Sequence, residues 1–488
     1  MSSHRVSPRA LKTAVVLAAA VLSARCATNP VTGERQFNLL SEAQELEIGQ
    51  QMHGEVIKTM GEYGDPALRE YVQRIGTQLA SHSHRPNLPW HFTIVNAPAI
   101  NAFALPGGYV YITRGILPYL DNEAELAGVL GHEIGHVTAR HAAQAYTRAT
   151  GGELALLGLG IFVPAARPFG QLGEMGLSVL FLKNSRNDEL QADKLGAEYS
   201  AKNGWDPAGV EGLLNTLARV EEATDSRGVP NWLETHPQPA DRVERVSATI
   251  AQLKTGPERY RVDRDEYLRR VDGVLYGDDP KEGIVRGSRF LHPDLQFAIE
   301  FPAGWDVTNG PTQVVAKQPD AEYYMVMQLV EDPRGRSVEE AARANMREAG
   351  FAEIQGGRET INGLDSYVGT YRGSVQSLGR VQAEVAHIAH NRKVYLVAGL
   401  AKENDFPQVR RLFERGFGSF HALSRREAED IRPNRVDLYV ARAGDTWQSI
   451  AQRAGEGIVK ATTLAIMNNH AVNDQPRPGE RLKIVVAG

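Results

Sequence analysis

Apolar side chains recur every three to four positions in two stretches, Asn122–Thr147 and Asn187–Ala201, which are rich in Ala, Leu and Glu. This period predicts two amphipathic helices. A further helix is expected to begin after Ser41, because the spacing to Gln44 is the glutamine form of a capping box. The segment that starts with PWHFTIV alternates apolar and polar residues, turns at Pro106-Gly107-Gly108 and continues as YVYIT. This pattern predicts a strand or a hairpin.

One apolar segment lacks such a period. Residues 154–182 are weakly hydrophobic, but Gly, Pro and Arg interrupt them. They do not supply the roughly 20 uninterrupted apolar residues of a membrane-spanning helix. Two interpretations are open for this segment: a mobile, partly apolar flap over a cleft, or a pair of ordinary core helices.

The pattern changes near residue 255. Residues 256–286 are highly charged and are expected to be a linker with one short helix. Residues 287–424 are rich in strand-like segments around one helical stretch and predict a separate α+β domain. A second charged linker at 425–435 precedes a small final unit at 436–488. The predicted fold class is α+β and multidomain, without internal repeats.

The N-terminus has the pattern of an export signal at residues 1–25. A basic start is followed by the short apolar run Ala14–Ala24 and then by Cys26. A lone cysteine at this place predicts a bacterial lipoprotein, with Cys26 acylated. Arg25 departs from that pattern, since Gly or Ala normally precedes the cysteine. The alternative is an uncleaved anchor helix with an incidental cysteine.

Composition adds two exclusions. The formal net charge is −5, from 54 basic and 59 acidic residues, so no electrostatic feature favours nucleic acid as a partner. With a single cysteine, no intramolecular disulfide is possible. Hydrophobic content of 42% is ordinary for a globular protein with real cores.

The strongest chemical signal is the H-E-x-x-H pattern at His132, Glu133 and His136. In a helix, positions four apart lie about 40° from each other on one face, so both imidazoles can reach one zinc ion. Glu133 can touch a zinc-bound water without binding the metal, and can take its proton as general base. The pattern is short, so the site needs a third ligand.

His141 is not expected to be that ligand. On a continuous helix it lies about 900° beyond His132 and therefore faces the opposite side. A metzincin would also have glycine at 139 and histidine at 142, where this chain has alanine twice. We interpret His141 as a surface or packing histidine.

Glu189 is the better third ligand. Glu189 and Asp193 are four residues apart on a predicted helix, so their carboxylates face one way. Glu189 can bind zinc, and Asp193 can accept a hydrogen bond from the far nitrogen of a ligand histidine. Taken alone, the pair is also typical of a solvated acidic helix face.

The segments VLGHEIGHVTARH, NDELQADKLGAEY and ETHPQPADR together resemble the HtpX/BepA-type zinc metallopeptidases, a zincin-type group of mainly helical domains with a small sheet. The resemblance covers residues 26–255. It implies one zinc ion per chain. The residues implied to bind zinc are His132, His136 and Glu189, with Glu133 as general base and Asp193 in support.

The resemblance assigns further roles outside the two helices. His236 is implied to lie near the metal, where it either stabilises the oxyanion or acts as a fourth ligand, and Arg242 is implied to anchor its loop. The segment Asn101–Tyr111 is implied to be an edge strand that pairs with an extended substrate. The residues assigned to that strand are Asn101, Phe103 and Gly108.

The C-terminal regions carry weaker resemblances. Residues 287–424 are similar to PsbP-like α/β domains, and residues 436–488 resemble a LysM module, a βααβ unit that binds peptidoglycan. Asp445 or Thr446 would cap its first helix. Trp447 departs from the LysM pattern, and a degenerate module without glycan binding is the alternative. The BepA branch usually continues into helical repeats, which this chain lacks.

Together these features predict an exported zinc endopeptidase that acts on misfolded or unassembled envelope proteins. It is expected in the periplasm as a lipoprotein, at the outer membrane rather than the inner one, and near peptidoglycan. The alternative is a metal-bound chaperone or scaffold with latent proteolysis. A peptidoglycan hydrolase is a weaker third reading, because nothing in the metal site points to glycan chemistry.

Overall fold

The computed structural model describes residues 26–148, 184–223, 236, 239–254, 259–310, 312–330, 337–375, 378–455, 458–471 and 473–487. The expected signal peptide at 1–25 and the expected flap at 154–182 lie outside these residues. The chain forms two compact units: residues 1–276 with 435–486, and residues 277–434. Each unit has helices and strands, which confirms the predicted α+β multidomain class.

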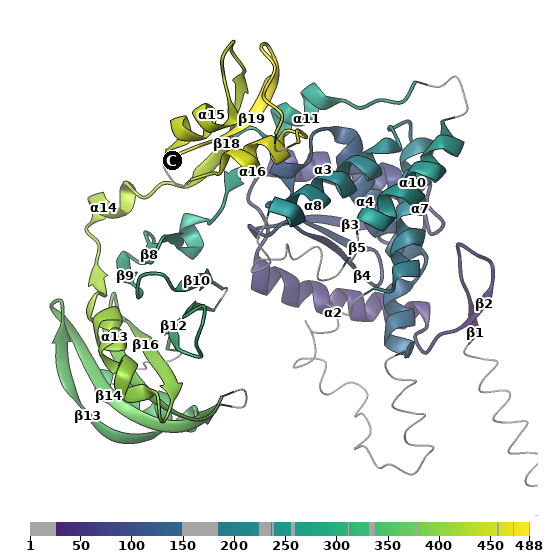
Figure 1. Ribbon diagram of the computed structural model, residues 1–488. Coiled ribbons are helices and arrows are strands. Elements are labelled where there is room, and N and C mark those ends of the chain that lie inside the picture. The colour runs from purple at the N-terminus through teal and green to yellow at the C-terminus, as the bar shows by residue number, and fades with distance from the viewer. Residues whose placement is uncertain are drawn as a thin grey trace, which may run out of the picture. The chain divides into compact units, whose positions relative to one another are not determined.

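The first unit is built around a three-stranded sheet of order β3-β5-β4. Strand β5 (Tyr109–Thr113) pairs in parallel with β3 (His91–Val95) and antiparallel with β4 (Ala102–Leu105). Residues of β5 alternate between two faces of the sheet: Val110 and Ile112 belong to the core that includes residues of α3 and α4, whereas Tyr111 clusters with Met52 and Val56 of α2. Helices α2 and α3 lie on opposite sides of the sheet (Figure 1). The small sheet and its hairpin turn agree with the sequence pattern.

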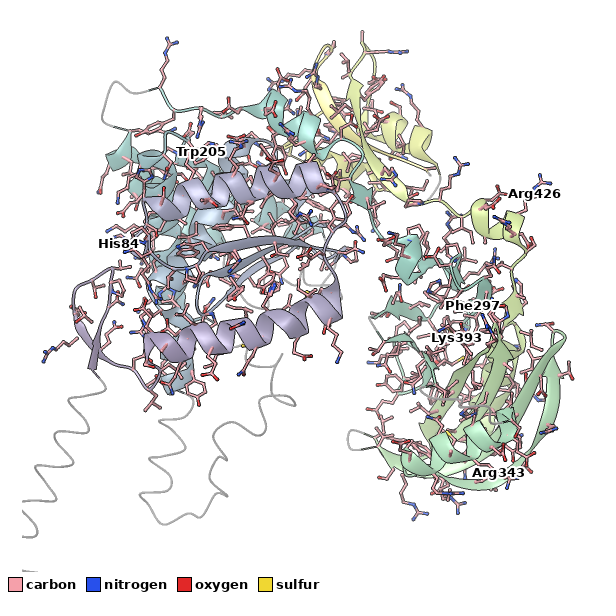
Figure 2. The ribbon with its side chains drawn as sticks, turned by 180° about the vertical axis from the view of Figure 1, so that it is seen from behind. His84, Trp205, Phe297, Arg343, Lys393 and Arg426 are labelled. Carbon is pink, nitrogen blue, oxygen red and sulfur yellow. The ribbon has the colours of Figure 1, made fainter. Side chains whose placement is uncertain are left out.

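Helices dominate the rest of this unit. The predicted capping box is confirmed, since Ser41 caps α2 and exchanges hydrogen bonds with Gln44. Trp205 lies fully buried among the helices, where Figure 2 labels it. The elements are α2 (Glu42–Met60), α3 (Pro66–Ser81), η1 (Leu117–Tyr119), α4 (Glu123–Thr138), α7 (Arg186–Lys202), α8 (Ala208–Ala223), α10 (Pro239–Leu253) and α11 (Arg264–Val271), with a leading hairpin of β1 (Cys26–Thr28) and β2 (Arg35–Phe37).

The charged segment at 256–286, expected to be a linker, belongs to the first unit as far as residue 276. It does contain a short helix, α11, but Tyr267 and Leu268 of that helix are fully buried and Tyr267 belongs to the main core of the first unit. Apolar residues spaced through the charged sequence explain this, because they give α11 one apolar side. The following strand β6 (Leu275–Tyr276) joins a sheet of order β19-β18-β6.

The C-terminal elements complete the first unit. They follow in the order β18 (Asn434–Val440), α15 (Trp447–Ala454), α16 (Ala461–Met467) and β19 (Arg481–Val486), which is the predicted βααβ order. Thr446 is the cap of α15. Lys483 of β19 is fully buried and donates a hydrogen bond to the backbone carbonyl of Leu120, just before α4. The module therefore packs on the helical domain rather than forming a separate unit.

The second unit contains a seven-stranded antiparallel sheet of order β10-β11-β12-β16-β15-β14-β13 (Figure 1). Neighbouring residues of β15 face opposite sides: Val385 packs with Met346 of α12, and Ala386 packs with Phe413 of α13. One helix thus covers each face. Phe297, labelled in Figure 2, stacks on Phe420 at 5.0 Å between ring centres.

The long strands of this sheet are β12 (Tyr324–Leu329), β13 (Ala352–Ile361), β14 (Leu364–Val375), β15 (Gly379–His390) and β16 (Lys393–Lys402), flanked by β10 (Asp306–Asn309) and β11 (Gln313–Lys317). The remaining elements are η2 (Pro280–Glu282), β7 (Ile284–Arg286), β8 (Arg289–His292), β9 (Phe297–Glu300), α12 (Val338–Glu348), α13 (Phe406–Gly418), β17 (His421–Ala422) and α14 (Arg425–Glu429). Within the described part of the chain, no helix combines the length and apolar character needed to cross a bilayer.

Candidate metal centre

Helix α4 carries the H-E-x-x-H residues and is buried along its whole length. Asn122 caps it by accepting a hydrogen bond from the backbone N–H of Glu125. The Nε2 atoms of His132 and His136 lie 3.0 Å apart. The four-residue spacing therefore directs both ring nitrogens to one point, as a helix requires.

Helix α7 approaches α4 closely because glycines line the contact. A Cβ built on Gly196 would lie 2.9 Å from the backbone nitrogen of His132, and one on Gly131 would lie 3.1 Å from the Cα of Gly196. This approach brings Glu189 to the two histidines. Its carboxylate oxygens lie 3.6 Å from Nε2 of His132 and 3.4 Å from Nε2 of His136.

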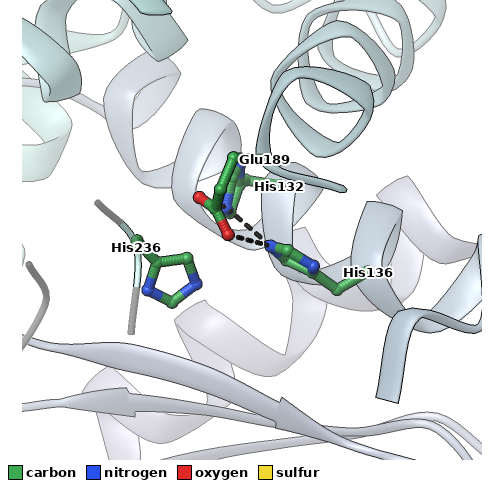
Figure 3. A group of neighbouring side chains, drawn as sticks. All are labelled: His132, His136, Glu189 and His236. Carbon is green, nitrogen blue, oxygen red and sulfur yellow. Dashed lines mark hydrogen bonds and ion pairs between the residues drawn. The ribbon is translucent and has the colours of Figure 1, made fainter. Parts of the chain in front are cut away.

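His236 is the fourth member of the cluster (Figure 3). One donor atom from each of His132, His136, Glu189 and His236 lies within 4.8 Å of the others, and all four residues are buried. The Nε2 of His236 is also 3.6 Å from a carboxylate oxygen of Glu133. The structure thus brings the sequence-predicted residues of the site together from three separate segments.

The donor set fits zinc. Zinc bonds to nitrogen and oxygen of about 2.0–2.1 Å in a tetrahedron place neighbouring donors roughly 3.3–3.4 Å apart. The three separations among His132, His136 and Glu189 are 3.0, 3.4 and 3.6 Å. Two imidazoles and one carboxylate are also one of the donor sets found in catalytic zinc sites.

A buried ion pair supports two of these residues. Arg242 donates two hydrogen bonds to Asp193, at 2.8 and 2.6 Å, and its third nitrogen lies 2.8 Å from Glu189. Asp193 in turn lies 3.0 Å from Nδ1 of His132. This is the arrangement expected of a carboxylate that orients a ligand histidine. Arg242 therefore pairs with two carboxylates of α7. Its expected role in anchoring the segment of His236 stays a prediction, because the residues next to His236 lie outside the described ones.

Burial sets the protonation states of the site. Desolvation lowers the pKa of His132 and of His136, so both rings stay neutral, as metal ligands must be. Desolvation also raises the pKa of Glu189 to about 8, against the opposing charge of Arg242. Burial and the charge of Glu189 raise the pKa of Glu133 well above its ordinary value. A divalent cation would favour the ionised carboxylates.

His141 is not among the four residues whose donor atoms converge, but the side of the helix predicted for it is wrong. The helix is not continuous here: α4 ends at Thr138, Arg140 takes a left-handed conformation with φ of 61°, and residues 141–148 are helical again. His141 is therefore not on the opposite side. It is buried, and its Nδ1 lies 2.8 Å from Nδ1 of His136. No Gly or Pro marks this break, so the sequence carries no signal for it.

The expected edge strand is also shorter than predicted. Gly107 and Gly108 take positive φ and turn the chain, so the segment Asn101–Tyr111 is a hairpin. Of its two strands, β4 lies at the sheet edge and β5 is central. Phe103 lies on β4, whereas Asn101 precedes it and Gly108 lies in the turn.

Comparison with known proteins matches residues 66–250 to the model of "Peptidase family M48". The chain is 30% identical over 252 residues to the beta-barrel assembly-enhancing protease of Escherichia coli K12, covering 50% of this chain and 51% of that protein. It is 32% identical over 237 residues to the mitochondrial metalloendopeptidase OMA1 of Schizosaccharomyces pombe, covering 46% of this chain and 67% of that protein. The chain thus spans about half the length of the first of these relatives.

Among solved structures, CyanoP, the PsbP protein of Synechocystis, matches with a TM-score of 0.24 and 16% identity over 28% of this chain and 95% of that one. LpqN of Mycobacterium tuberculosis matches with a TM-score of 0.21 and 12% identity over 29% of this chain and 90% of that one. At these scores the PsbP-like character of residues 287–424 stays a prediction.

Proposed function

Because the chain belongs to peptidase family M48, we propose that it is a zinc-dependent endopeptidase that hydrolyses misfolded or unassembled cell-envelope proteins. Membership rests on the family match and on the OMA1 relative, of which the chain covers 67%. One observation carries the proposal: the four buried residues of the cluster each place one possible metal-ligand atom within 4.8 Å of the others. A scaffold would need such ligands, but it would not need Glu133 beside them.

We assign His132, His136 and Glu189 as the zinc ligands and Asp193 and Arg242 as their support. Bound there, zinc would supply a Lewis acid that polarises the scissile carbonyl and acidifies the attacking water. The protein's own contribution is to hold the neutral imidazoles and Glu189 in place. The glycine contact between α4 and α7 keeps these donors at bonding separation.

Glu133 is the proposed general base. It follows His132 on the same helix, and its buried side chain has a raised pKa, which suits a group that takes a proton and passes it on. In this proposal Glu133 accepts the proton of the attacking water and then delivers it to the leaving amine. His236, 3.6 Å from Glu133, is proposed either to stabilise the oxyanion or to act as fourth ligand.

The proposed substrate path runs along β4. The carbonyl of Asn101 accepts a hydrogen bond from Thr113 on β5, so Asn101 faces the sheet. Strand alternation then turns the peptide groups of Ala102 and Ala104 toward the outer edge of the sheet, away from β5. An extended substrate would add to the sheet through these two residues.

The site of action is proposed from the relatives and from the sequence. Proteins named for beta-barrel assembly support envelope proteins as substrates and the periplasm as location. Acylation of Cys26 would anchor the chain to the outer membrane, and mass spectrometry of the purified protein tests it. Residues 436–488 are proposed to bind peptidoglycan, which co-sedimentation with purified sacculi tests.

The decisive experiment compares wild type with Glu133→Gln for casein cleavage and zinc content. We expect equal zinc and loss of cleavage, because the amide cannot accept the proton. Glu55→Gln, at an exposed position of α2, is the matched control and should behave as wild type. Undiminished cleavage by Glu133→Gln would refute the general base, and a wild-type protein that binds no zinc would refute the metal assignment.

A further inference from the structure

A chain of hydrogen bonds leads away from the buried site behind His136. Its Nδ1 lies 2.8 Å from Nδ1 of His141, and Nε2 of His141 lies 3.0 Å from the side-chain oxygen of Gln191 on α7. His136 is 7% exposed and His141 is 1% exposed. Water is therefore largely excluded from this contact, so the Nδ1 atom of each ring must find its hydrogen-bond partner in the other ring.

The direction of these bonds follows from the zinc site, so this inference rests on the proposed function. Nε2 of His136 points to the donor cluster, 3.4 Å from Glu189. If Nε2 binds metal, Nδ1 carries the proton and donates it to His141. His141 then accepts through Nδ1 and must carry its own proton on Nε2, which it donates to the oxygen of Gln191. A single tautomer satisfies both bonds.

We infer that His141 is a positioning residue for the ligand His136, and that Gln191 selects the tautomer of His141 that can accept. With the other tautomer, two N–H groups would oppose each other at 2.8 Å. The two ligand histidines are thus oriented differently: His132 by the ionised pair of Asp193 with Arg242, and His136 by a neutral imidazole.

A neutral acceptor suits this position. Glu133, Glu189 and Asp193 are all buried beside the site, and Arg242 is the cation paired with two of them. A carboxylate in direct contact with His136, at the place of His141, would add another buried negative charge to these, which is costly. The carboxylate of Asp188 lies farther away, 3.8 Å from Nε2 of His141, and is paired with Arg148. An imidazole orients the ring through the same hydrogen bond and adds no charge.

The fold places His141 through a contact distant in sequence. Arg140 donates a hydrogen bond of 2.7 Å to Glu45 and another of 2.9 Å to the carbonyl of Leu40, both at the start of α2. Arg85 also donates to Glu45, at 3.0 Å. These bonds hold Arg140 in its left-handed conformation, and this turn brings His141 back against His136.

The test compares three variants of the full chain for zinc affinity, measured by competition with a chromogenic chelator. His141→Ala removes the acceptor and should weaken zinc binding about 10- to 100-fold. His141→Asn keeps an acceptor oxygen near the place of Nδ1 and should stay within about threefold of wild type. Gln191→Met should weaken binding about tenfold.

Comparison of the zinc affinities of the two His141 variants separates positioning from packing. His141→Ala and His141→Asn both remove the ring, so a packing role would weaken zinc binding in both alike. The inference requires that the Asn variant recovers affinity. It is overturned if Ala and Asn bind zinc equally well, or if Gln191→Met binds as wild type. Absence of zinc binding by wild type itself would instead overturn the proposed function.

Discussion

The closest helix contact of the site offers a quantitative test. In Gly196→Ala the new Cβ would lie 2.9 Å from the nitrogen of His132 and 3.3 Å from its Cα. Relaxed contacts between such atoms are about 3.5–4.0 Å, so α7 must move away from α4 by roughly 0.5–1 Å. Zinc sites tolerate departures of about 0.2 Å in bond length. Glu189 moves with α7, and the site therefore opens.

The size of the effect follows from the strain. Overpacking of this kind costs about 1–3 kcal/mol. If the zinc-free protein retains the close contact, the strain lowers its free energy of unfolding. If it relaxes by separating the helices, zinc must draw Glu189 back, and the same energy weakens zinc binding by roughly 5- to 150-fold. We therefore predict that the loss in free energy of unfolding and the loss in zinc-binding free energy together add up to about 1–3 kcal/mol.

The assay is urea unfolding of the zinc-free protein together with zinc titration of the folded protein. Gly54→Ala is the matched control, because Gly54 is on α2 with no atom within 4 Å of an added Cβ. It should raise the free energy of unfolding by about 0.5–1 kcal/mol, as expected for an alanine in a helix, and leave zinc affinity unchanged. If Gly196→Ala matches this control in both measurements, the close-contact reasoning is refuted.

Three further predictions concern other parts of the molecule. Burial lowers the pKa of His387 to about 4, so the unfolded chain binds an extra proton between about pH 6.5 and 4. The second unit should therefore lose up to about 3 kcal/mol of stability as the pH falls through that window. His387→Gln keeps a donor toward Asn345 and should abolish this pH dependence of stability, as measured by hydrogen exchange at several pH values. An unchanged pH dependence in the variant would contradict the prediction. Lys483→Met removes the donor to Leu120 and should lower the free energy of unfolding of the first unit by about 1–3 kcal/mol in urea; an unshifted midpoint would count against it. Chelation of zinc should lower the melting temperature of the first unit alone in calorimetry, because all four donors lie there, and a shift in both units would exclude this account.

Several features were readable from residues close together along the chain. The capping box of Ser41 and Gln44, the two helices of the site and the turn at Gly107 all depend on local backbone geometry. The shared face of His132 and His136 is likewise a property of any α-helix with that spacing. For these features the interacting groups are at most a few positions apart, so a periodic pattern is sufficient to predict them.

The rest depended on groups that are far apart along the chain. Glu45 lies 95 residues from Arg140, yet it accepts a hydrogen bond from Arg140 at the left-handed turn after which His141 contacts His136. Arg242 reaches 49 residues back to Asp193. The buried side of α11 lies in a charged segment, and its residues Tyr267 and Val271 pack in the helical core of the first unit. The partners in these contacts are far apart along the chain, so the hydrophobic pattern of one segment does not predict them. Only the packed tertiary structure brings the partners together.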